Sequence, residues 1–223
     1  MAILAKDSRF VFLLAPGTGS TVVAEALVNA ELGRWFPLDD MRMGDGQGED
    51  AFVPVKHTHY GHFRRWLLLE RPLEHYQFVT TVRNPFDFWV SEYLRHRNRW
   101  ADGLDDPNSH VHLTALGVDM VAKSRELEFA DWLAYRWSKF SRKHQQLLHP
   151  LFTENADHVL RFERLEASLT DWLQSLGITE TVSLPVINVT KRDSDYRSYY
   201  DASSRQLVER IFAPYLERFG YAF

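Results

Sequence analysis

The 223-residue sequence contains no cysteine, which excludes disulfide bonds, thiolate metal sites and cysteine nucleophiles. A cysteine-free chain suits a reducing environment, so we expect a cytoplasmic protein. The longest apolar run, residues 10–15, is far shorter than the roughly 20 residues that a membrane-spanning helix needs. The first residues also lack the basic segment and apolar stretch of a secretory signal. We therefore expect neither a membrane span nor secretion.

An excess of positive charge is missing as well. The formal net charge of −4 at pH 7 argues against a general nucleic-acid-binding protein, although it leaves room for a local basic site that binds an anion. Internal repeats and low-complexity tracts are absent. The composition, 45% hydrophobic and 25% charged, is typical of a globular domain, and we predict a single domain over residues 1–223.

Predicted strands alternate with predicted helices along the chain. The apolar run at residues 9–15 is typical of a strand buried on both faces, and helical periodicity follows over residues 21–32. We expect Gly33 to stop this first helix. The further predicted strands are 51–57, 75–82 and 158–165, and the further predicted helices are 62–70, 86–97, most of 100–151, 165–178 and 201–220.

This order of elements predicts an α/β fold. Strand–helix–strand units connect parallel strands, so we expect a central parallel sheet with helices on both faces. The long helical stretch forms an insertion between the third and fourth predicted strands. Ligands of such folds bind beyond the carboxyl ends of the strands, which directs attention to the loops that follow them.

The loop Pro16–Thr21, with the sequence PGTGST, connects the first predicted strand to the first predicted helix. A helix N-terminus in this setting directs backbone N–H groups and the positive end of the helix dipole toward an anion. Gly17 and Gly19 allow close approach of the backbone, and Ser20 and Thr21 add hydroxyl groups. The loop matches neither the Walker A motif nor the dinucleotide fingerprint, which disfavours nucleotide kinases and dehydrogenases. An ordinary strand–helix turn is the structural alternative.

A second anion anchor is predicted where the third strand ends. Arg83 lies at this point, and its planar guanidinium suits a phosphate group. Asn84 is a good N-cap and Pro85 suits the first helical position. Asp87 and Ser91 share a helix face with Asn84, so Arg83 and Ser91 can converge on one phosphate. An Arg83–Asp87 ion pair with a solvent-facing Ser91 is the structural alternative.

At these two motifs the sequence resembles the sulfotransferases that use 3′-phosphoadenosine 5′-phosphosulfate (PAPS), in particular soluble relatives of the carbohydrate sulfotransferases. The segment TVRNPFDFWVSEY at residues 81–93 resembles their 3′-phosphate motif, and PGTGST resembles their 5′-phosphosulfate loop. Supporting similarity lies in LRFERL at 160–165, in a cofactor-covering loop at 188–201 and in the closing segment 213–223. The resemblance covers most of the chain and implies a P-loop-like three-layer sandwich.

The resemblance implies in-line transfer of a sulfuryl group from PAPS to a hydroxyl, which releases adenosine 3′,5′-bisphosphate and needs no metal. The acceptor is then a hydroxyl-bearing small molecule, lipid or carbohydrate, and the family usually builds the acceptor pocket from helical insertions. The implied donor-binding residues are Gly17, Thr18, Gly19, Ser20 and Thr21 at the 5′-phosphosulfate, Arg83 and Ser91 at the 3′-phosphate, and Lys191 and Arg192 over the cofactor.

Gly17 departs from the family pattern. The family usually has lysine or arginine after the proline of this loop, and that cation neutralises charge on the bridging oxygen as sulfate leaves. Either another cation supplies the charge, with Lys56, Lys191 and Arg192 as candidates, or the protein is a PAPS-binding relative that does not catalyse transfer.

The segment KHTHYGH places three histidines, His57, His59 and His62, after the second predicted strand. Histidine titrates near neutral pH, and the resemblance implies that one of the three is the general base. We favour His57, then His62, then His59. An H-x-H pair with a third histidine nearby is also a zinc-binding pattern, which would make the protein a metallohydrolase. Hydrogen-bonded structural histidines are the third interpretation.

Overall fold

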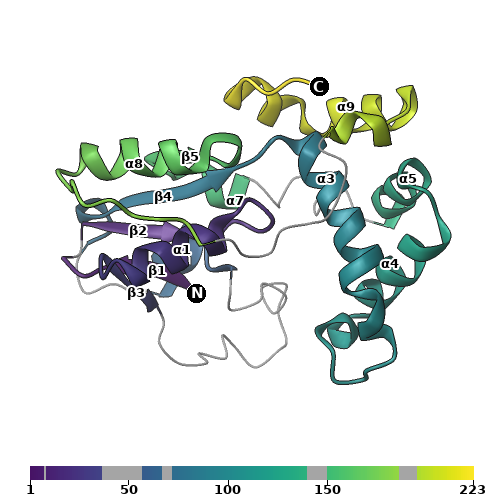
Figure 1. Ribbon diagram of the computed structural model, residues 1–223, viewed down its shortest axis with the longest axis horizontal. Helices are drawn as coiled ribbons and strands as arrows, with labels where there is room; N and C mark the ends of the chain where they lie inside the picture. The colour runs from purple at the N-terminus through teal and green to yellow at the C-terminus, as the bar shows by residue number, and fades with distance from the viewer. Residues whose placement is uncertain (8, 37–56, 67–71, 140–149, 186–194) are drawn as a thin grey trace. The chain divides into compact units, whose positions relative to one another are not determined.

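The computed structural model describes residues 1–7, 9–36, 57–66, 72–139, 150–185 and 195–223 (Figure 1). The chain divides into two compact units. The first unit draws on residues 1–83 and 147–187, and the second on residues 84–146 and 188–223. Among the described helices, none is both long enough and apolar enough to cross a membrane.

The first unit is built on a five-stranded sheet with the strand order β3-β1-β2-β4-β5. The predicted parallel strands are present as β2 (Phe10–Leu13), β4 (Gln77–Val82) and β5 (His158–Arg161). Two further strands, β1 (Ala2–Ala5) and β3 (Gly33–Phe36), pair antiparallel with each other, and β1 also pairs antiparallel with β2. The α/β class is confirmed, but the sheet is mixed and not purely parallel.

The prediction for Gly33 was wrong. Helix α1 (Ser20–Asn29) ends before it, and the left-handed residue is Glu31, with a φ angle of 57°. Gly33 instead opens strand β3, where an added Cβ atom would overlap with Cγ2 of Ile3. The glycine therefore permits close packing of two strands, which a local helix-stop rule does not anticipate.

Alternating side chains of β2 pack into two hydrophobic cores. Phe10 and Phe12 pack in the core that includes residues of α1 and α8, and Val11 and Leu13 pack in the core that includes residues of α2 and α7. Helices on both faces of a sheet make the three layers that were predicted, and a strand covered on both faces is apolar throughout. The bounds are α2 Tyr60–Trp66, α7 Pro150–Thr153 and α8 Leu165–Ser175. The predicted strand at 51–57 lies outside the described residues, except for His57.

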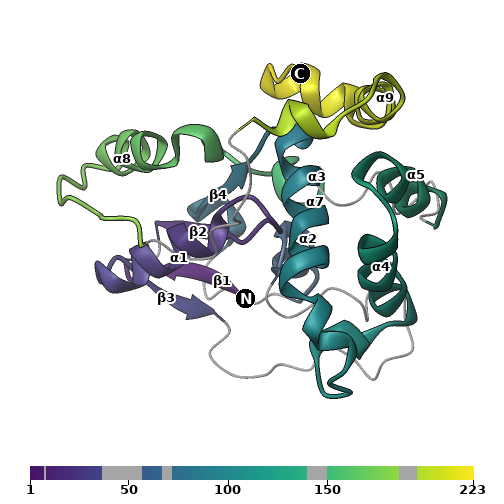
Figure 2. The same ribbon diagram turned by 45° about the vertical axis from the view of Figure 1, so that its right-hand side comes forward.

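The second unit is helical and has an aromatic core. The indole of Trp89 lies 5.3 Å from that of Trp137 and 6.0 Å from the ring of Phe212, measured between ring centroids. The predicted helical insertion is thus present in the described residues between β4 and β5 (Figure 2). The helices of the unit are α3 Pro85–Leu94, which continues as the π-helix η3 Arg95–Arg99, α4 Ala115–Glu126, α5 Phe129–Lys139 and α9 Ala202–Phe219.

Candidate functional site

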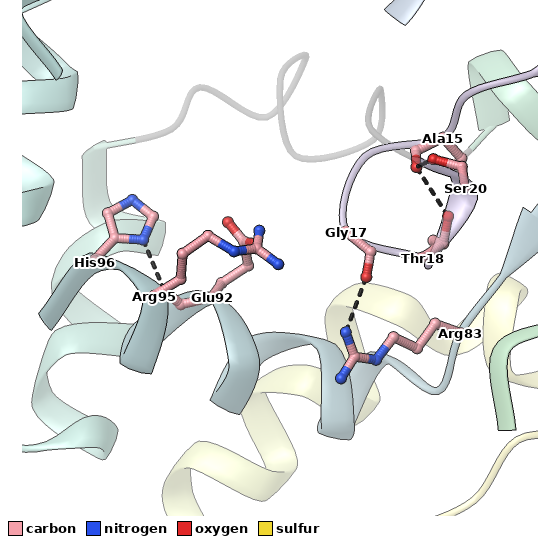
Figure 3. A network of polar contacts seen from close by, with 8 residues as sticks. All are labelled: Ala15, Gly17, Thr18, Ser20, Arg83, Glu92, Arg95 and His96. Atoms are coloured by element: carbon pink, nitrogen blue, oxygen red, sulfur yellow. Dashed lines mark hydrogen bonds and ion pairs between the residues drawn. The ribbon is translucent and has the colours of Figure 1, made fainter. Parts of the chain in front are cut away.

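The loop between β2 and α1 forms a tight turn at the carboxyl end of the strand. Gly17 and Gly19 have φ angles of 69° and 78°, a region that residues with a side chain rarely adopt. The hydroxyls of Thr18 and Ser20 both donate to the carbonyl of Ala15, over 2.8 and 2.7 Å (Figure 3). These two bonds hold the backbone of the loop in one conformation.

Strand β4 supports the same loop from the side. The hydroxyl of Thr18 contacts the hydroxyl of Thr81, and the hydroxyl of Thr80 donates to the carbonyl of Leu13 over 3.1 Å. All three threonines are buried. Buried hydroxyls that are fully hydrogen-bonded add rigidity, so the loop is fixed to two neighbouring strands.

Helix α1 begins without a side-chain cap. Its N-cap residue is Gly19, which makes no side-chain cap hydrogen bond to the first amides of the helix. The amides of Val22 and Val23 are directed at the carbonyl of Gly19, over 3.0 and 3.4 Å. The first amides of any helix lack partners within the helix and carry its positive partial charge. A helix start of this kind presents N–H donors to an anion.

Arg83 follows β4 directly and reaches the same loop. Its Nη1 donates to the carbonyl of Gly17 over 2.9 Å, as Figure 3 shows. Its guanidinium carbon lies 4.1 Å from the centre of the Phe162 ring, and only 5% of the residue is exposed. Since β2 and β4 are parallel and adjacent, their carboxyl ends meet at one edge of the sheet. The structure therefore brings the two predicted anion anchors together within the first unit.

Ser91 and the helix that carries it belong to the second unit. Asn84 caps α3 as predicted, because its side chain accepts a hydrogen bond from the amide of Phe86 over 3.0 Å, and Pro85 occupies the first turn. Ser91 is buried within α3. Convergence of Arg83 and Ser91 on one phosphate stays a prediction. Lys56, Lys191 and Arg192 lie outside the described residues.

The three histidines lie at and just before the start of α2 and differ in their hydrogen bonds. His57 Nδ1 lies 2.8 Å from the carbonyl of Leu14, which is the residue that follows β2. A carbonyl only accepts, so this contact requires a proton on Nδ1 and leaves Nε2 as the basic nitrogen of a neutral ring. His59 and His62 each accept a backbone N–H at Nδ1, from Gly61 over 3.1 Å and from His59 over 3.2 Å respectively. The Leu14 carbonyl therefore orients His57 with its proton on Nδ1.

The same contacts weaken the zinc interpretation. The rings of His59 and His62 lie close together and tilted, with centroids 3.8 Å apart and an angle of 35° between their planes. Their Nδ1 atoms accept backbone N–H groups, so a neutral ring carries its own proton on Nε2, and neither nitrogen then offers a lone pair to a metal. No group of three or more histidines and carboxylates within the described segments is arranged to hold a metal ion.

The second unit contains a polar cluster that no sequence motif indicates. Glu92 pairs with Arg95, and His96 Nδ1 donates to the carbonyl of Glu92 over 2.7 Å (Figure 3). Burial lowers the pKa of His96 to about 4, so this histidine is neutral at physiological pH. The guanidinium of Arg136 lies 5.2 Å from the centre of the Trp89 ring, and burial lowers its pKa too.

Comparison with known families gives one result. The sequence profile described as "Sulfotransferase family" matches residues 1–222, which is nearly the whole chain. Searches of curated proteins and of solved structures give no significant match.

Proposed function

Since the chain belongs to the sulfotransferase family, we propose that it transfers a sulfuryl group from PAPS to the hydroxyl of an acceptor and releases adenosine 3′,5′-bisphosphate. The observation that carries this proposal is the pairing of an uncapped helix start with Arg83 at one edge of the sheet. A donor with anionic groups on both its 5′ and 3′ positions suits two anchors of this kind.

The residues at the two anchors fit the two ends of the donor. The amides of Gly17, Thr18, Gly19, Ser20 and Thr21 would hold the 5′-phosphosulfate, because the loop is fixed and the helix dipole favours negative charge. Arg83 would hold the 3′-phosphate together with Ser91, and so select PAPS over ATP. Lys191 and Arg192 are proposed as further contacts from the covering loop. Bound PAPS supplies the sulfuryl group that is transferred.

We assign the general base to His57. Its Nδ1 proton is directed at the carbonyl of Leu14, so Nε2 is the atom that takes a proton from the acceptor hydroxyl. An imidazole fixed in one tautomer is prepared for this role, since the hydrogen bond of one ring nitrogen sets the state of the other. His62 and His59 follow as less suited candidates, because backbone amides donate to their Nδ1 atoms.

The cation that the family usually has after the proline of this loop is missing at Gly17. Charge held beside a leaving oxygen stabilises the transition state of a group transfer. Arg83 is assigned to the 3′-phosphate, at the other end of the donor. We therefore propose that Lys56, Lys191 or Arg192 supplies the charge beside the bridging oxygen.

The test is transfer of labelled sulfate from PAPS to a panel of small-molecule, lipid and carbohydrate hydroxyls, with release of the bisphosphate measured in parallel. We expect labelled sulfate ester and bisphosphate in equal amounts for at least one acceptor class. Binding of the bisphosphate without transfer to any class would indicate a non-catalytic PAPS-binding protein. Transfer abolished by a zinc chelator would contradict the metal-free reaction.

A further inference from the structure

The ring of Phe162 contacts both anion anchors of the first unit. The guanidinium carbon of Arg83 lies 4.1 Å from the ring centre, within the range of a cation–π interaction. Gly19 lies against the same ring, since a Cβ atom added there would be 2.8 Å from Cδ2 of Phe162 and 3.1 Å from Cε2. One side chain therefore touches the N-cap of α1 and the arginine that follows β4.

The sheet register explains how this contact arises. In the parallel pair of β4 and β5, Val82 is opposite Arg161. Arg83 follows the last residue of β4 and Phe162 follows the last residue of β5, so the two side chains are neighbours at the carboxyl edge of the sheet. The loop after β2 reaches the same edge, because β2 lies on the other side of β4.

The loop needs glycine at position 19 for two reasons. The φ angle of 78° is left-handed, and the ring of Phe162 with the Cδ2 atom of Leu165 occupies the space that a side chain would need. The backbone of the helix start thus rests directly on the ring. Movement of Phe162 would remove one support from both Gly19 and the guanidinium of Arg83, which keeps its hydrogen bond to the Gly17 carbonyl.

We propose that Phe162 is a positioning residue that fixes the guanidinium of Arg83 relative to the helix start of α1 and so sets the preference for a nucleotide that carries both a 5′-anion and a 3′-phosphate. This inference rests on the proposed donor. An arginine has several rotatable bonds, and a ring under its guanidinium removes much of that freedom before the ligand arrives. The ring itself contributes no hydrogen bond, so it acts through Arg83.

The experiment measures calorimetric dissociation constants of adenosine 3′,5′-bisphosphate and of AMP, which lacks the 3′-phosphate, on the full chain. The preference is the ratio of the AMP constant to the bisphosphate constant. We expect Phe162→Leu to lower this ratio by about tenfold, the size of a partly buried cation–π contact. Phe162→Tyr keeps the ring and should keep the ratio within about twofold of wild type. Phe162 is only partly buried, so both variants should fold.

Two controls separate positioning from other roles. Phe10→Leu makes the same replacement in the core of the first unit, away from Arg83, and should leave the ratio unchanged. In an Arg83→Ala background, Phe162→Leu should have no further effect on bisphosphate affinity, because the ring acts through the arginine. A further loss in that background would mean that the ring touches the nucleotide directly, and would overturn the inference.

The remaining outcomes are also decisive. If Phe162→Leu keeps the wild-type ratio, the inference is overturned and the proposed donor still stands. A wild-type protein that binds neither nucleotide overturns the proposed donor, and the inference with it. An equal fall of the ratio in Phe162→Tyr and Phe162→Leu would show that the aromatic ring does not set the preference for the 3′-phosphate, and would also overturn the inference.

Discussion

The start of α1 in the first unit differs from three helix starts in the second unit in how its amide groups are satisfied. Helix α2 of the first unit resembles the second unit, because the His59 side chain accepts a hydrogen bond from the amide of Gly61. In the second unit, α3, α4 and α9 begin at Asn84, Thr114 and Asp201, and each of these side chains accepts a hydrogen bond from an amide of its own helix. In the first unit, α1 begins at Gly19 with no side-chain cap. Helix α8 also lacks one, but it continues directly from the 3-10 turn at residues 162–164.

The difference agrees with the proposal that the start of α1 binds an anion, whereas the capped starts of α3, α4 and α9 serve their own helices. A side-chain cap stabilises a helix by about 1 kcal/mol relative to alanine, whereas a glycine such as Gly19 gives up only about a few tenths of a kcal/mol. Such a loss is expected where the amides are needed for a ligand. The polar groups of the second unit are used internally, as in the bonds from Tyr93 to the Leu127 carbonyl and from Trp132 to the Met120 carbonyl.

The largest expected effect is on kcat, when the proposed base His57 in the first unit is replaced. His57→Gln should lower kcat by about 10²–10⁴-fold, because a glutamine cannot take up the acceptor proton. Affinity for the bisphosphate should stay within about threefold of wild type, since a base contributes little to donor binding. His59→Gln is the matched control and should retain most turnover. A His57→Gln variant with full activity would move the base to His62 or His59.

The next effect concerns the uncapped helix start itself. Gly19→Ala places a side chain at a φ angle of 78° and 2.8 Å from the Phe162 ring, so the loop must shift. We expect bisphosphate affinity to fall by about 100-fold, as expected when several charge-assisted hydrogen bonds are lost together. Titration calorimetry measures it. Gly177→Ala also has a left-handed glycine but nothing within 4 Å of the added Cβ, and should leave affinity unchanged.

A third effect is a pH dependence confined to the second unit. The pKa of His96 is lowered to about 4 by burial, whereas an unfolded histidine has its ordinary value of 6.5. Between these values only the unfolded chain takes up the proton, so stability falls as pH decreases from 6.5 toward 4. We expect His96→Gln to remove on the order of 2 kcal/mol of this acid-dependent decrease in the free energy of unfolding. Urea unfolding at neutral and acidic pH measures it, and parallel profiles for both proteins would contradict it.

The smallest effect is expected at a capped helix start. Thr114 accepts a hydrogen bond from the amide of Gly117 over 2.9 Å, and Thr114→Ala should lower the free energy of unfolding by about 1 kcal/mol. Affinity for the bisphosphate should not change, because this cap serves only its own helix. Chemical unfolding and calorimetry together check both parts. A clear loss of affinity would erase the distinction between the two kinds of helix start.

Local patterns in the sequence predicted the elements that carry the site. The apolar run of β2, the glycines of the loop and the Asn84-Pro85 cap each act within a few residues, so their geometry follows from the residue types. The antiparallel strand β1 was missed because four apolar residues are too few to show a period. The roles of Gly33 and Phe162 depend on residues distant in sequence that meet through strand register, and no local pattern indicates them.

The most direct test of the account is to follow backbone amide resonances on addition of adenosine 3′,5′-bisphosphate. We expect large shifts for residues 17–21, at the uncapped start of α1, and none for residues 115–117, at the start of α4, because the amide of Gly117 is already bonded to Thr114. Binding that leaves the amides of residues 17–21 unshifted would contradict the claim that this helix start holds the anion.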